Sequence, residues 1–170
     1  MKKQRTGYIV VVIHLGVIMT LFGAILCETF LLYPNIFHDI PHSLEIGMKF
    51  MAVRGPQDFF PSLGMLVMLT GIVSLIFYFR KPPVNYLILS SMMMIFVGEF
   101  LLSMFYFWPR NTIMFVEGAA VHSISILKQT AQEFQTGHWF RVIGCGVAAL
   151  LSWWGFFRID RINESSGEIL

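Results

Sequence analysis

Charged side chains are scarce in this chain. Lysine, arginine, aspartate and glutamate make up 13% of its 170 residues, against about a quarter in a soluble domain. Hydrophobic residues make up 56%, and the mean hydropathy is +0.68. These values exclude an ordinary soluble domain and favour a single integral membrane domain over residues 1–170. The net charge of +2 is too small to indicate a nucleic-acid partner.

Cysteine is also rare, and internal repeats are lacking. Cys27 and Cys145 form no CxxC pair, and no cysteine–histidine spacing is typical of a zinc site. Both lie in apolar stretches, so we expect both to be buried packing residues, as free cysteines commonly are. The absence of an inverted repeat argues against an autonomous transporter.

Long hydrophobic runs, by contrast, are abundant. Four of them are long enough for a helix to cross about 30 Å of hydrocarbon. Because the runs are continuous rather than alternating, they do not suit barrel strands. We therefore expect an all-α fold, a four-transmembrane-helix bundle with spans at about 8–33, 62–79, 84–108 and 139–157.

Basic residues near the ends of these spans predict the direction of the chain. If the N-terminus is inside, seven lysines and arginines lie on the cytoplasmic side and five on the other side. All seven lie close to span ends, where the positive-inside rule applies. We therefore expect a multi-pass membrane protein with both termini in the cytoplasm. The first apolar run is too long for a signal peptide and is expected to be retained.

The two outer connections are not simple polar loops. Residues 35–61 are rich in proline and apolar residues, and they predict a packed cap with a short helix around Leu44–Val53. Residues 112–134 contain no proline and repeat apolar residues at a helical period. They predict an amphipathic helix over the mouth of the bundle, which Gly137 then breaks before the fourth span.

Two glutamates interrupt the apolar runs. Glu28 lies about five residues below the outer end of the first span and Glu99 about nine below that of the third, so their depths differ by only about 6 Å. A carboxylate in hydrocarbon costs at least a few kcal/mol and seldom faces lipid. Two interpretations stay open. The groups are either neutral acids hydrogen-bonded across helices, or carboxylates that face a cation, a metal or a ligand.

Other polar residues lie toward the same side. His138 and Arg141 open the fourth span three positions apart, so they share a helix face. They are either interfacial anchors or part of a site in which Arg141 is the counter-charge to the glutamates. Asn111 follows the third span, toward the same side. Their convergence predicts a polar pocket in the outer half of the bundle.

A metal site of mixed histidine and carboxylate type also stays open. His38 and His42 are four residues apart, but Pro41 between them makes a helical pair unfavourable. The candidate ligands are Glu28, Glu99, His138, His42, His38 and His122.

Two local patterns carry a resemblance to a known family. Pro109-Arg110-Asn111 follows the third span, and Phe134-x-x-x-His138-x-x-Arg141 opens the fourth. With an amphipathic connector between them, they resemble the anthrone-oxygenase-like family of small four-helix membrane proteins, formerly a domain of unknown function. The likeness covers nearly the whole chain and includes a glycine-rich first span that ends near a proline. Phe134 stands where the family has a tryptophan.

The resemblance implies oxidation of an anthrone to an anthraquinone by molecular oxygen, without a dedicated cofactor. Asn111, His138 and Arg141 are the residues it carries over, while Glu28 and Glu99 have no place in the family pattern. An anthrone must lose a proton to become an enolate before oxygen reacts. His138, Glu28 or Glu99 would take that proton. Arg141 and Asn111 would stabilise the enolate oxygen.

Three functions are thus weighed from the sequence. The first is a membrane-embedded oxidoreductase of oxygenase type that acts on an apolar, aromatic small molecule taken from the bilayer. The second is a carrier of a small molecule or ion, or a non-catalytic subunit of a larger membrane complex or homo-oligomer. The third is a structural module whose glutamates are hydrogen-bonded between helices.

Overall fold

Four long helical rods and one short helix, α3 (His42–Phe50), make up the described part of the chain. The computed structural model describes residues 2–165. The first rod joins α1 (Lys2–Cys27), the π-helical η1 (Glu28–Leu32) and α2 (Tyr33–Phe37), and the second is α4 (Pro56–Tyr78). The fourth is α8 (Ile124–Ser165). The third joins six elements: α5 (Val84–Ile95), η2 (Phe96–Leu101), η3 (Ser103–Phe107), α6 (Trp108–Asn111), η4 (Thr112–Glu117) and α7 (Gly118–Val121).

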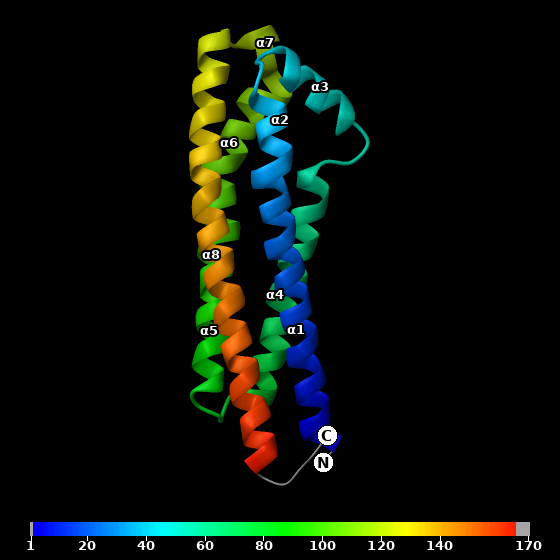
Figure 1. Cartoon of the computed structure of the whole chain (residues 1–170), viewed down its shortest axis with the longest axis vertical. Helices are drawn as coiled ribbons and strands as arrows, with labels where there is room; N and C mark the ends of the chain where they lie inside the picture. Colours follow the sequence, from blue (N-terminus) through cyan, green and yellow to red (C-terminus); the bar gives the residue numbers. More distant parts are fainter. Residues whose placement is uncertain (1, 166–170) are drawn as a thin grey trace.

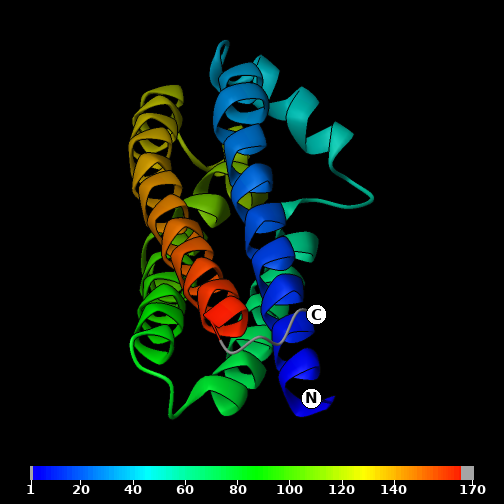
Figure 2. The same ribbon diagram turned by 60° about the horizontal axis from the view of Figure 1, so that its bottom comes forward.

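The rods form an up-and-down bundle. α1 packs against α4 and α8, and α5 also packs against α4 and α8, so each rod has two neighbours in a closed ring. The two termini lie at the same end, and α2, α3 (His42–Phe50) and α7 lie at the other (Figures 1 and 2). The end that carries α3 and α7 is called the cap end below.

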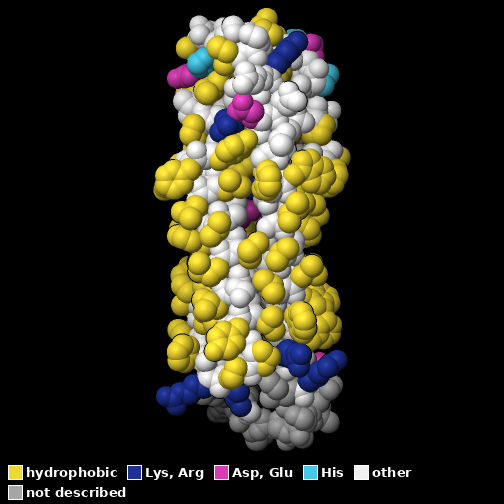
Figure 3. Space-filling model, turned by 90° about the vertical axis from the view of Figure 1, so that its left-hand side faces the viewer, with side chains coloured by type: hydrophobic (Ala, Val, Ile, Leu, Met, Phe, Trp, Pro, Cys, Tyr) yellow, Lys and Arg dark blue, Asp and Glu magenta, His cyan; other side chains and the backbone are white. Residues whose placement is uncertain are grey.

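The surface of the bundle is suited to a bilayer. Four helices, Gln4–Phe37, Pro56–Tyr78, Val84–Val121 and Ile124–Arg161, are long and apolar enough to span one. Large apolar side chains are exposed along all four rods. Figure 3 shows such side chains over the middle of one face, with lysine and arginine gathered toward its ends. The all-α four-helix expectation is confirmed, and the chain is an integral membrane protein.

The connector between the third and fourth rods differs from the expected one. The helix does not end at Pro109, because this proline lies in the first turn of α6, where its missing N–H is tolerated. The chain turns instead at Gly118, whose φ of 56° suits glycine, and α8 begins at Ile124. The separate amphipathic helix over residues 112–134 was therefore a wrong prediction.

Gly137 likewise does not break α8. A Cβ at this position would overlap the Tyr106 ring, so the glycine permits close packing between the third and fourth rods. The apolar residues that preceded it in the expected connector, including Leu127, Ala131 and Phe134, form the core at the cap end. The expected short helix in residues 35–61 is present as α3.

Candidate functional site

Glu28 and Glu99 both lie in π-helical segments. Glu28 begins η1, Glu99 lies within η2, and their side chains are buried, with relative exposures of 5% and 6%. A π-helical turn inserts an extra residue and rotates the side chains that follow, and such turns are frequent at functional sites. The two buried acids thus coincide with the points where the first and third rods depart from α-helical geometry.

Arg141 pairs with Glu99 across the bundle. Its Nε and Nη2 atoms both donate to Glu99 Oε2, at 2.9 and 2.5 Å. Its guanidinium carbon lies 5.4 Å from the ring centre of Phe60 and 5.1 Å from that of Phe107. Arg141 therefore pairs with a carboxylate on η2 and lies close to an aromatic ring on α4.

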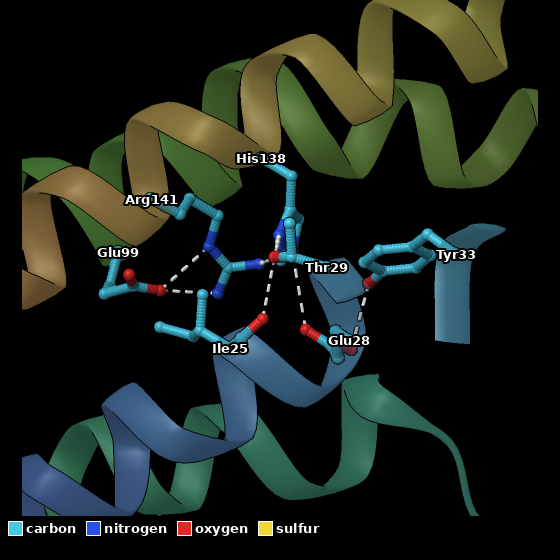
Figure 4. A network of polar contacts seen from close by, with 7 residues as sticks. All are labelled: Ile25, Glu28, Thr29, Tyr33, Glu99, His138 and Arg141. Atoms are coloured by element: carbon cyan, nitrogen blue, oxygen red, sulfur yellow. Dashed lines mark hydrogen bonds and ion pairs between the residues drawn. The ribbon is translucent and has the colours of Figure 1, made fainter. Parts of the chain in front are cut away.

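The tautomer of His138 follows from its neighbour Thr29. The Thr29 hydroxyl donates to the carbonyl of Ile25 at 2.7 Å, so its oxygen accepts from His138 Nδ1–H at 2.8 Å. The Nε2 atom of a neutral His138 then carries a lone pair. It lies 3.4 Å from Arg141 Nη1 and 3.4 Å from Glu28 Oε2. Figure 4 shows how these side chains face one another.

Only one of the two carboxylate oxygens of Glu28 accepts a hydrogen bond within the described chain. The hydroxyl of Tyr33 donates to Glu28 Oε1 at 2.9 Å. Ring contacts with Phe37, Phe134 and His138 hold Tyr33 in place. Glu28 Oε2 is buried and has no hydrogen-bond partner among the described residues, and the same holds for Glu99 Oε1. A buried acceptor without a partner is costly and calls for a proton, a water or a ligand.

The charges of this cluster do not balance by themselves. Arg141 contributes one positive charge, the two carboxylates contribute two negative charges, and a neutral His138 contributes none. The sum is −1 for four side chains that are each more than nine-tenths buried, where an uncompensated charge is expensive. Two acceptor atoms, Glu28 Oε2 and His138 Nε2, face each other at 3.4 Å. One proton placed between them would make the cluster neutral.

A pocket reaches this cluster from the side. It measures about 690 Å³ and lies between the first rod and the start of α4, beneath the end of α3. Glu28 lines it, and most of the remaining lining is apolar or aromatic, including Phe50, Phe59 and Phe60. A second pocket of about 410 Å³ lies between the first rod and α3. Glu28 and Phe50 line both pockets, so residue Glu28 lies between the two spaces and the polar cluster.

The expected residues are thus only partly assembled. Glu28, Glu99, His138 and Arg141 meet as the sequence predicted, from the first, third and fourth rods. Asn111 lies on α6, half-buried, and makes none of the hydrogen bonds of this cluster within the described chain.

The metal hypothesis is not supported. His38 and His42 are exposed at the cap end, and His122 pairs with Glu117. Among the described residues, no three histidine, cysteine, aspartate or glutamate side chains converge as metal ligands. The candidate ligands Glu28, Glu99 and His138 are engaged with Tyr33, Arg141 and Thr29 instead.

The cysteines also differ from expectation. Cys145 is buried, as expected, but Cys27 is exposed, and both are free thiols. Cys27 borders both pockets. It was misjudged because an apolar run in a membrane protein presents as many residues to lipid as to the core.

Thr29 and Tyr33 were not found from the sequence. Tyr33 lies five residues after Glu28, a spacing that an α-helix places on different faces. In the π-helical η1 the i and i+5 positions come together, which lets the two side chains meet. No sequence pattern marks this turn, although an ionisable residue within an apolar run is a hint of one.

A second polar layer lies toward the termini. His14 Nδ1 contacts Thr70 Oγ1 at 3.0 Å, and His14 Nε2 contacts Ser152 Oγ at 3.2 Å. Ser91 completes the layer, 2.8 Å from Ser152, so all four rods contribute one side chain. Between this layer and the Glu28 cluster lies a buried apolar layer: Ile18, Leu21, Ile25, Val67, Ile95, Cys145 and Ala148.

Comparisons with protein-family models, with curated proteins and with solved structures give no match for this chain. The family resemblance described from the sequence therefore stays a prediction, and the function is inferred from the geometry of the site.

Proposed function

We propose that this membrane protein is an oxidoreductase of the anthrone-oxygenase-like type, which acts on an apolar aromatic molecule taken from the bilayer. One observation carries the proposal: Glu28, whose buried side chain has an unpartnered oxygen, lines a largely apolar pocket of about 690 Å³. A pocket of this volume and lining is typical of small-molecule sites.

The surroundings of the pocket favour a ligand that arrives from lipid. Phe50, Phe59 and Leu66 line it, with relative exposures of 80%, 50% and 45%. These side chains join the lining of the pocket to the apolar surface of the bundle, and the exposed Arg54 and Asp58 line it as well. We therefore expect a flat hydrocarbon ring system to enter from the acyl chains.

The proposed first step is removal of a proton from an activated C–H bond of the substrate. The base is the cluster after it has released the proton shared by Glu28 and His138. Glu28 Oε2 then takes the substrate proton, and His138 Nε2 at 3.4 Å accepts the resulting O–H hydrogen bond. Glu28 is then the group that touches substrate. His138 has a relative exposure of 0% and lies behind it, so its role is to position and share the proton. This revises the expected role of His138 as the base itself.

Dissolved oxygen then oxidises the deprotonated carbon. For an anthrone, the CH₂ group becomes a carbonyl. One oxygen atom of O₂ enters the product, and the other leaves as water with the two hydrogens removed. Arg141 offsets the charge of Glu99, and its Nη1 lies 3.4 Å from His138 Nε2. The carboxylate of Glu99 therefore adds no net negative charge to the site when the substrate loses its proton.

The site is proposed to lie in the outer leaflet, with both termini in the cytoplasm. Both termini lie at one end of the bundle and the pockets lie toward the cap end. The turn that carries Arg80 and Lys81 lies between α4 and α5, at the same end as the termini. This arrangement suits the positive-inside rule.

The test is oxygen consumption by the purified chain in lipid nanodiscs with an anthrone as substrate. Wild type is expected to consume one O₂ per anthraquinone formed. Glu28→Gln keeps the shape but not the base and is expected to be slower by at least about 100-fold, the usual worth of a positioned base. Glu45→Gln, an exposed carboxyl on α3 outside the pockets, is the matched control. Equal rates for Glu28→Gln and wild type would remove the proposed role.

A further inference from the structure

The charge of the Glu28 cluster decides which ligands its pocket prefers. Glu28 is faced by the Tyr33 hydroxyl from α2, by His138 and Arg141 from α8 and, farther away, by Glu99 from η2. The positive charge of Arg141 is matched by Glu99. Glu28 is therefore left with the negative charge that no side chain of the cluster balances.

Among the described residues, Arg54 is the one cation that lines this pocket, and Asp58 lines it too. Both side chains are exposed to solvent, and their formal charges are opposite. Their effect on a buried carboxylate is correspondingly weak. Phe60 lines the pocket, and the centre of its ring lies 5.4 Å from the guanidinium carbon of Arg141.

The aromatic lining adds a second attraction for positive charge. Phe50, Phe59 and Phe60 all line the pocket, and the Phe59 and Phe60 rings meet edge to face. The face of an aromatic ring attracts an organic cation, and quaternary ammonium groups are commonly bound in this way. An apolar pocket with aromatic walls and one buried carboxylate thus suits a cation with apolar substituents better than a hydrated metal ion.

We propose that the pocket binds a lipophilic organic ammonium ion next to Glu28, and that the ion displaces the proton that Glu28 shares with His138. One cation enters and one proton leaves, so the cluster is neutral before and after binding. This inference depends on the pocket of the proposed function but not on its oxidation chemistry. Such an ion is a competitive ligand if the protein is an enzyme.

The experiment is isothermal titration of the full chain in nanodiscs of zwitterionic phosphatidylcholine. The probe is benzyltriethylammonium, and its uncharged isostere benzyltriethylsilane is the matched control ligand. Titration in two buffers with different enthalpies of ionisation counts the protons released. We expect about one proton per bound cation, and a Kd that rises by up to about tenfold for each unit by which pH is lowered.

Variants locate the site. Glu28→Gln is expected to weaken cation binding by at least about tenfold and to abolish proton release. Glu45→Gln is expected to leave both unchanged. If the silane binds as tightly as the ammonium ion, if no proton is released, or if Glu28→Gln binds like wild type, the proposal is wrong.

A measurement on wild type decides the matter even if Glu28→Gln does not fold. Cys27 is exposed and borders the pocket. The ammonium ion is expected to slow its reaction with a maleimide, and to do so more strongly at higher pH, whereas unchanged labelling at saturating probe would overturn the proposal. No oxygen or anthrone is present in these measurements, so their failure is distinguishable from absence of oxidase activity.

Discussion

Removal of Arg141 should show how much the buried Arg141–Glu99 ion pair contributes to the free energy of unfolding. Arg141 and Glu99 are both more than nine-tenths buried, and Arg141 donates twice to a single carboxylate oxygen. In Arg141→Met the carboxylate would keep no described partner, because its other oxygen has none already. Breaking a buried pair from one side costs about 3–5 kcal/mol.

The double variant separates the pair from the packing. Replacing both charges, as in Arg141→Met with Glu99→Gln, leaves no uncompensated ion in the core. Such replacements are often nearly neutral. The free energy of unfolding should therefore return to within about 1–2 kcal/mol of wild type. The assay is unfolding by titrated sodium dodecyl sulfate in mixed micelles, followed by tryptophan fluorescence.

A second, partly exposed ion pair of the same chain is the control. Arg110 pairs with Glu133 at the cap end, where both side chains are partly exposed. Arg110→Met should therefore destabilise the chain far less than Arg141→Met does. The reasoning fails if Arg141→Met is as stable as wild type, or if the double variant is no more stable than the single one.

Three further predictions concern the geometry of the site and of the bundle. Thr29→Val removes the acceptor of His138 Nδ1–H and should lower the free energy of unfolding by about 1–3 kcal/mol; nitrogen NMR of the imidazole should show loss of the single tautomer. Gly137→Ala places a Cβ against the Tyr106 ring and should destabilise by about 1–3 kcal/mol, whereas Gly144→Ala, with open space around it, should not; chemical unfolding compares the two. Reporter domains fused to either terminus should be cytoplasmic, so that alkaline phosphatase fusions are inactive and green fluorescent protein fusions bright.

The fold could be predicted from the sequence because it depends mainly on the number, length and hydropathy of the apolar runs. Four uninterrupted apolar runs leave few alternatives in a bilayer, since every backbone polar group must be satisfied within a helix. An even number of spans then places both termini on one side, as Figure 1 shows. Helix ends were harder to predict, because Pro109 and Gly137 usually interrupt helices but lie here in the first turn of α6 and in a close contact.

The candidate site was predictable in its charged members and not in its neutral ones. Glu28, Glu99 and Arg141 stand out because ionisable groups are rare in apolar runs. Thr29 and Tyr33 do not, because threonine and tyrosine are unremarkable there, and Tyr33 reaches Glu28 only through a π-helical turn. Asn111 was expected to join the charged residues because it follows Pro109, the expected end of the third span, whereas the helical rod continues past this proline.

The apolar layer beneath the site has a consequence for proton exchange. Ile18, Leu21 and Val67, with neighbours from the other rods, separate the Glu28 cluster from the His14 layer, and each is almost fully buried. The side chains of these three residues carry no hydrogen-bonding group that would link the two polar layers. We therefore expect a proton that Glu28 takes up or releases to exchange with the aqueous phase at the cap end.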